Sequence, residues 1–333
     1  MENFLKYIIP RFFQWIIVIF VGVTIVFIVP RLTPMDPVQS TISRITALTD
    51  TNPEAMEKLI NTLKDLYGLK GSLLEQYLRF WKHLFIGDLG PSLTMFPATV
   101  IEVIKISLPW TIGLMTISTI IAWFLGVILG TFAGYFSNRK WSQIIGTIVM
   151  CIYPIPYYII ALTLVLLFAY VFPIFPLMGG VSIGLKPSLS WSFITSLLKH
   201  GFLPAISLII GTVGWIFMSQ RALISRLTTS DFIVFAETAA LPRRKILFYL
   251  IRNSMLPQVT DLALSLGGIF SGALVTEWVF SYPGIGQILY SAILQGDFNL
   301  MMGISIFSII GIATAALILD LIYPLLDPRI RYK

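Results

Sequence analysis

Residues 221–257 read RALISRLTTSDFIVFAETAALPRRKILFYLIRNSMLP, the longest charged interruption in an otherwise apolar C-terminal half. The stretch carries six Lys and Arg residues against two acids. Its middle, 231–241, predicts a short amphipathic helix, because Asp231 is a suitable N-cap and apolar residues follow at helical spacing. The residues expected to share that face are Phe232, Phe235, Ala236 and Ala239, and Pro242 would end the helix. The opposite face of such a helix would be free for a partner.

The composition around this stretch is that of an integral membrane protein. Of 333 residues, 56% are hydrophobic and 12% are charged, whereas a soluble domain has about 25% charged residues. The net charge is +7, but the basic residues fall between apolar segments and are not gathered on one exposed face. This distribution disfavours nucleic-acid binding. The single cysteine, Cys151, excludes an internal disulfide and any CxxC metal or redox site.

Six apolar segments are expected to cross the membrane. The first follows Lys6 and Arg11 and is too long for the core of a signal peptide, so we expect it to remain uncleaved. Two prolines, Pro154 and Pro156, would bend the third, either as a tolerated kink or as one that shapes a pathway. The predicted segments are 12–29, 106–138, 141–185, 201–220, 259–280 and 298–319.

The distribution of basic residues predicts that both termini are cytoplasmic. In that arrangement the cytoplasmic segments hold thirteen Lys and Arg residues, and the two short external loops hold two. The external segment 31–105 holds eight, but segments longer than about 60 residues escape this rule.

Within 31–105, a helical stretch opens at 52–54 and apolar residues recur at helical spacing over 74–85. This region is either an interfacial helix resting on the membrane or an external platform for a substrate-delivering partner. A second external loop is expected around 172–184, followed by the amphipathic segment 190–199.

Several residues are candidates for helix packing or gating. Gly126, Gly130 and Gly134 repeat at every fourth residue, a spacing that lets two helix backbones approach closely. Glu277 would either pair across an external gate or, as we favour, extend its carboxylate to the membrane surface. Asp320 is expected to be a packing or interfacial acid, paired with a basic residue such as Arg329.

The chain lacks the chemistry that would power uphill transport by itself. It contains no GxxxxGK[ST] nucleotide loop, no catalytic Ser/His/Asp set and no metal-site pattern, so we expect neither an enzyme nor a metal protein. It also lacks the row of mid-membrane charges expected for ion coupling, although an ion-coupled secondary transporter and a purely structural subunit remain alternatives. Energy would then arrive from another protein through the 231–241 helix.

Four motifs resemble one known family. The Phe232-x3-Ala236-Glu237-Thr238-Ala239-Ala240-Leu241 segment looks like the EAA loop of ABC importer permeases. GDLGPSL (87–93), EWVFSYPGIG (277–286) and LLDPRIR (325–331) resemble B-type permeases of the dipeptide, oligopeptide and nickel importers. The resemblance covers nearly the whole chain. One departure is Ala240, which stands where the EAA loop usually has Gly; because alanine enters the left-handed region at a cost, we expect Pro242 to shape the turn instead.

The resemblance implies an all-α type I ABC importer permease in a prokaryotic inner membrane. Its partners would be a homologous second permease, two ATPase subunits that bind ATP and Mg²⁺, and an external solute-binding protein. The solute would be a di- or oligopeptide, with oligosaccharides and nickel complexes as alternatives. The expected divisions are a first helix (1–30), an external segment (31–105) and a five-helix core (106–333) with the loop 221–257. The residues expected to dock the ATPase are Asp231, Phe232, Phe235, Ala236, Glu237, Ala239, Ala240, Leu241, Arg243 and Arg244.

Overall fold

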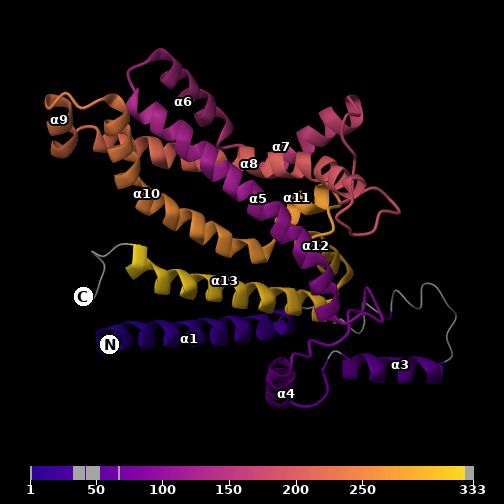
Figure 1. The fold of residues 1–333 in the computed structure, drawn as a ribbon. Coiled ribbons are helices and arrows are strands. Elements are labelled where there is room, and N and C mark those ends of the chain that lie inside the picture. Colours follow the sequence, from indigo (N-terminus) through magenta and orange to yellow (C-terminus); the bar gives the residue numbers. More distant parts are fainter. Residues whose placement is uncertain (1, 33–41, 43–52, 67, 327–333) are drawn as a thin grey trace.

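A computed structural model describes residues 2–32, 42, 53–66 and 68–326. The regular elements in this described part are all helices, as the sequence predicts (Figure 1). The C-terminal residues 327–333, which include Arg329, lie outside it. The α-helices are α1 (Glu2–Leu32), α3 (Pro53–Leu66), α4 (Leu73–Ile86), α5 (Val100–Tyr135), α6 (Lys140–Ile152), α7 (Tyr157–Val165), α8 (Trp191–Leu227), α9 (Asp231–Thr238), α10 (Arg243–Gly267), α11 (Leu274–Val279), α12 (Ile285–Gln295) and α13 (Phe298–Leu326).

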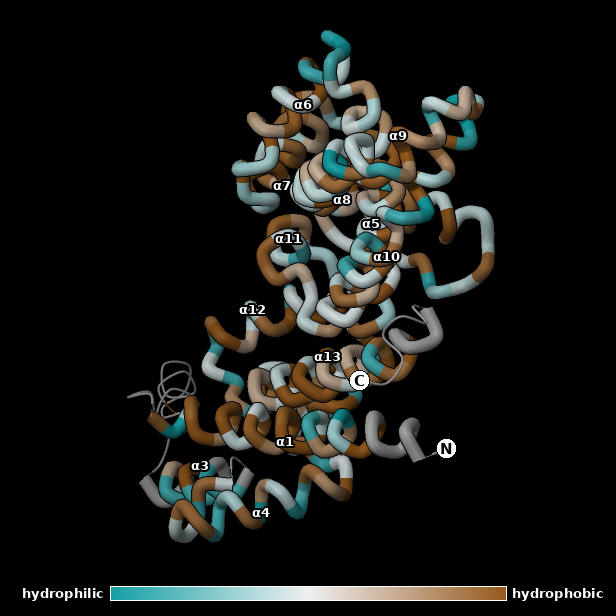
Figure 2. The backbone as a smooth tube through the Cα atoms, turned by 90° about the vertical axis from the view of Figure 1, so that its left-hand side faces the viewer, coloured by the Kyte–Doolittle hydropathy of each residue, from teal (hydrophilic) through white to brown (hydrophobic). Residues whose placement is uncertain are grey.

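Within the described residues, four helices are long and apolar enough to cross a membrane, namely α1, α5, α8 and α13. A fifth crossing is present if α6 and the helical stretch from Tyr157 to Val171 count as one span. These two pieces meet at 90°, where Pro154 and Pro156 lie between them. Hydrophobic residues make up most of α1 and α13 (Figure 2), and many apolar side chains of α1 are exposed, which is the arrangement expected of helices that face lipid.

Among the described helices, α5 and α8 share the most extensive contact. Three glycines of α5 lie on this contact, and a Cβ atom at Gly130 would come within 2.7 Å of the Phe217 carbonyl oxygen. Gly126 and Gly134 approach α8 one turn away on either side. The absence of side chains at these positions lets the two backbones pack directly against each other.

Helix α8 is longer than the sequence analysis predicts. The 190–199 segment, expected in an external loop, instead forms the first turns of α8, which continues without interruption to Leu227. Ser190 is the N-cap, and its hydroxyl accepts a hydrogen bond from the Phe193 amide. The N-cap at Ser190 explains why the helix begins this early, and it continues through Gly201 and Pro204.

The segment predicted as a continuous fifth span is broken. Helix α10 ends at Gly267, a short 3₁₀ turn occupies Gly268–Ser271, and α11 follows after Gly272. Gly272 has φ 72°, a conformation that glycine adopts without steric cost. The turn that follows α11 is short, because α12 already begins at Ile285.

Helices α1 and α13 lie side by side in both views (Figures 1 and 2). The Trp15 indole N–H donates to Thr314 Oγ1 at 3.2 Å. Arg11 of α1 pairs with Asp320 at 3.5 Å; Arg329, the partner expected from the sequence, lies outside the described residues.

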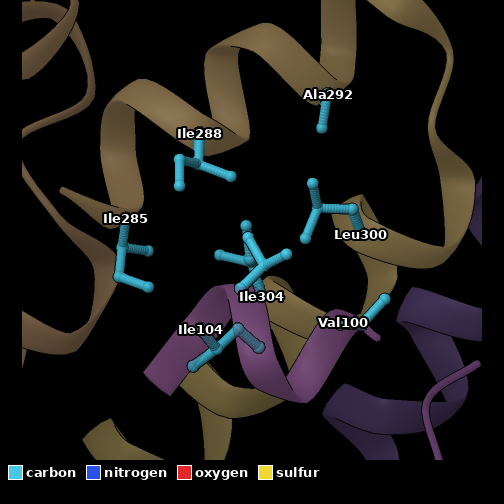
Figure 3. Packing of buried hydrophobic residues seen from close by; sticks show 8 residues of the cluster. Val100, Ile104, Ile285, Ile288, Ala292, Leu300 and Ile304 are labelled. Atoms are coloured by element: carbon cyan, nitrogen blue, oxygen red, sulfur yellow. The ribbon is translucent and has the colours of Figure 1, made fainter. Parts of the chain in front are cut away.

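A buried apolar cluster fixes the end of the molecule where α5 and α13 begin. Val100 and Ile104 of α5 meet Leu300 and Ile304 of α13, and α12 covers them with Ile285, Ile288 and Ala292 (Figure 3).

Candidate coupling helix and the two buried carboxylates

Helix α9 lies at one end of the molecule, between the C-terminus of α8 and the N-terminus of α10 (Figure 1). Its N-cap is Ser230, and Asp231, the expected N-cap, is the first helical residue. A carboxylate in the first turn still interacts favourably with the helix dipole. The helix is eight residues long, too short to be stable without tertiary contacts.

Those contacts come from two residues on the inner face of α9. Ile233 is fully buried and Ala236 nearly so, and both join a cluster with Ile224 of α8 and with Ile246 and Leu250 of α10. Ala236 therefore packs inside its own chain, which corrects its prediction as a residue that enters a partner's groove. The sequence analysis missed Ile233 as the anchor, although its spacing of three from Ala236 is a helical signal.

The outer face of α9 is apolar and uncovered in the described structure. The side chain of Phe235 is 75% exposed, that of Val234 51% and that of Phe232 42%. Phe232 and Phe235 were among the residues predicted to dock a partner, and Val234 was not. Exposed apolar side chains at the tip of a polar loop are typical of a protein–protein contact.

The C-terminus of α9 closes in a Schellman motif. The Leu241 amide donates to the Ala236 carbonyl at 3.0 Å, and the Ala240 amide donates to the Glu237 carbonyl at 2.9 Å. Ala240 takes the left-handed position of this motif, with φ 51°. The expectation that Pro242 would spare it this conformation is therefore wrong, because the hydrogen-bond pattern at the helix end itself requires a residue with positive φ there.

The basic residues that follow belong to the next helix. Pro242 is the N-cap of α10, and Arg243 and Arg244 are its first exposed residues. Asp231 and Glu237 of α9 are also exposed, so this loop presents both acidic and basic side chains.

Glu277 is the first of two buried carboxylates at the other end of the core. Its side chain is 0% exposed, so it does not extend to the membrane surface as favoured from the sequence. One carboxylate oxygen accepts from the Thr111 hydroxyl of α5 at 2.9 Å, and the other accepts from the Gly286 amide of α12 at 2.7 Å. The Thr111 hydroxyl oxygen also accepts from the Ile285 amide at 2.8 Å. Glu277 and Thr111 together tie α5, α11 and α12 into one unit.

Asp297 is the second buried carboxylate, and the sequence analysis missed it. Its Oδ1 accepts from the Leu300 amide at 3.1 Å, which caps the first turn of α13. Its Oδ2 accepts from the Ser92 hydroxyl at 2.7 Å and from the Leu93 amide at 2.8 Å. An Asp immediately before a long apolar run was the available signal. The contact anchors the end of the GDLGPSL motif to α13.

The chain was compared with known proteins. Residues 126–332 match the family described as "Binding-protein-dependent transport system inner membrane component". The chain is 29% identical to the oligopeptide transport system permease protein OppB of Haemophilus influenzae, over 98% of this chain and 100% of that protein. It is 28% identical to OppB of Escherichia coli K12, with the same coverage, and 28% identical to the dipeptide transport system permease protein DppB of Bacillus subtilis, over 98% of each chain. The matched family region contains α9, Glu277 and Asp297.

Proposed function

The chain belongs to the family of inner membrane components of binding-protein-dependent transport systems, and from this premise we propose that it is the permease subunit of an ATP-driven importer of di- and oligopeptides. The proposal of a peptide solute is supported by the names of relatives that match over nearly the full chain.

The proposed topology has six crossings with both termini in the cytoplasm. Five of them are α1, α5, the bent α6–α7 pair, α8 and α13. The remaining crossing is α10 followed by the 3₁₀ turn and α11, which returns the chain from the α9 side to the external side. This assignment keeps the thirteen basic residues of the short loops and tails on the cytoplasmic side.

In this topology α9 is the cytoplasmic helix that receives motion from an ATPase. The single observation that carries this role is its two-sided packing: Ile233 is locked between α8 and α10, while Phe235 is left exposed. A push on the outer face would be transmitted through the buried face into both spans. The exposed residues proposed to contact the ATPase are Asp231, Phe232, Val234, Phe235, Glu237, Ala239, Arg243 and Arg244.

The proposed complex supplies what this chain lacks. Two ATPase subunits would bind ATP and Mg²⁺, a homologous second permease would complete the pathway, and an external binding protein would deliver the peptide. The chain would itself catalyse no reaction.

Phe235→Asp tests the docking role. This variant places a charge where the proposed groove is apolar, and we expect loss of peptide uptake together with loss of the ATPase from the purified complex. Phe235→Leu is the matched control, because it keeps an apolar side chain and should retain both. Normal uptake and normal ATPase recovery by Phe235→Asp would overturn the docking role.

The proposed solute is tested by competition. Uptake of a labelled tripeptide should be inhibited by unlabelled peptides, but not by oligosaccharides or nickel complexes.

A further inference from the structure

Helix α4 carries an apolar stripe that the described chain covers only at Trp81. Leu74, Leu78, Trp81 and Phe85 recur at i, i+4, i+7 and i+11, which places them on one side of the helix. Leu74, Leu78 and Phe85 are each at least 60% exposed. A neighbouring stripe is polar and also exposed, and it includes Arg79 and Lys82. The helix therefore has two different exposed surfaces.

A third face of α4 packs on α1. The Arg31 guanidinium donates to Gln76 Oε1 at 3.2 Å, and Tyr77 contacts both the Thr24 hydroxyl, at 2.8 Å, and the ring of Phe27. The ring of Trp81 stacks on that of Phe20, with centroids 5.4 Å apart. These contacts bind α4 firmly to the C-terminal half of α1.

The Phe20 contact fixes the depth of α4. Phe20 lies twelve residues before Leu32, the last residue of α1, which corresponds to about 18 Å along the helix axis. The span that contains both residues, Ile8–Leu32, is about 37 Å long, whereas the hydrocarbon layer is about 30 Å thick. The side chain of Trp81 therefore reaches well inside the apolar layer, and Leu78 and Phe85 adjoin it one turn away on either side.

We propose that α4 is an interfacial helix whose apolar stripe is covered by the acyl chains of the external leaflet. The stripe continues the exposed apolar surface of α1, whose span is only 11% buried within the chain. The polar stripe, with Arg79 and Lys82, would face the lipid headgroups and water. A water-soluble binding protein would have to enter the hydrocarbon layer to cover Leu78.

Spin labels test this assignment. Cys151 is the only cysteine of the chain, so a Cys151→Ser background allows a single nitroxide at Leu78→Cys. The assembled transporter is placed in phosphatidylethanolamine–phosphatidylglycerol nanodiscs, and collision of the nitroxide with oxygen and with a water-soluble nickel chelate is measured. Arg79→Cys, the next residue and about 100° around the helix on the polar stripe, is the matched control. Leu74→Cys replaces Leu78→Cys if that variant does not fold.

Lipid coverage predicts a several-fold preference for oxygen over the nickel chelate at position 78 and the reverse preference at position 79. Strong collision with the nickel chelate at position 78 would place the stripe in water and overturn the proposal. Weak collision with both reagents at position 78 would also overturn it, because the stripe would then be covered by a protein, either the second permease or the binding protein.

Discussion

Ala240 has a backbone conformation that glycine adopts at lower cost. Its φ of 51° is required by the Schellman hydrogen bonds at the end of α9. An L-residue with a Cβ pays about 1–2 kcal/mol in this region, so Ala240→Gly should stabilise the loop by about 1 kcal/mol. The measurement is thermal unfolding of the purified complex in detergent, and a higher midpoint is expected.

The adjacent alanine is the control for that experiment. Ala239 has φ −74°, where glycine brings no steric relief and loses more entropy on folding. Ala239→Gly should therefore lower the midpoint, and equal effects of the two variants would argue against a left-handed Ala240.

Thr111 is the second residue whose role can be isolated. Its hydroxyl donates to Glu277 and accepts from the Ile285 amide, both buried. Thr111→Val would leave a buried carboxylate oxygen and a buried N–H without this partner, at a cost of about 1–3 kcal/mol. Thr111→Ser keeps the hydroxyl and should cost much less. Denaturation midpoints of the two purified variants would separate these outcomes, and equal midpoints would show that the hydroxyl is unimportant.

At the scale of elements, α9 depends on its anchor. Ile233→Ala removes a fully buried side chain from the α8–α9–α10 cluster and should cost about 2–5 kcal/mol of local stability. Because α9 is too short to persist alone, we expect faster amide hydrogen exchange across 231–241 while exchange in α5 stays unchanged. Peptide uptake should fall with it, since a loosened helix transmits less motion.

Val234→Ala is the control on the same helix. Val234 is half-exposed, so its truncation leaves no internal cavity, and exchange in α9 should remain close to that of the wild type. Rapid exchange in both variants would mean that the buried cluster does not hold the helix.

The elements also show how far a sequence can be interpreted. Long uncharged runs were sufficient to predict α1, α5 and α13, because burial in lipid depends mainly on composition. The break between α10 and α11 was missed, since hydropathy does not register the conformational freedom of Gly267, Gly268 and Gly272. The amphipathic segment 190–199 was assigned to an external loop, and the sequence pattern did not reveal that it is continuous with the following span as the single helix α8.

The candidate site was predicted unevenly for a related reason. The exposed Phe232 and Phe235 follow from helical spacing next to a charged loop. Which face packs on α8 and α10 depends on tertiary contacts, so Ala236 was assigned to the wrong side. The burial of Glu277 depends on Thr111, 166 residues away in the chain, a pairing that no local pattern reveals.

At the scale of the whole molecule, the proposed topology predicts which loops can be labelled from each side. In the Cys151→Ser background, Asn138→Cys and Thr229→Cys should react with a membrane-impermeant maleimide only from the cytoplasmic side. Ser188→Cys and Gln295→Cys should react only from the outside. All four positions are exposed in the structure. Labelling of Gln295→Cys from the cytoplasm would remove the α10–α11 crossing and reduce the count to five.

The continuity of α8 has a mechanical consequence. A helix of 37 residues is about 55 Å long, and its last turns share a buried cluster with α9. Tilted as one body, it would pivot about the glycine contact with α5. Tilting such a rod by about 5° would swing its far end, near Trp191, through an arc of about 5 Å if it pivoted at the α9 end, and through less about a central fulcrum. A small displacement of α8 at one membrane face would thus move its other end at the opposite face, with no loop between them.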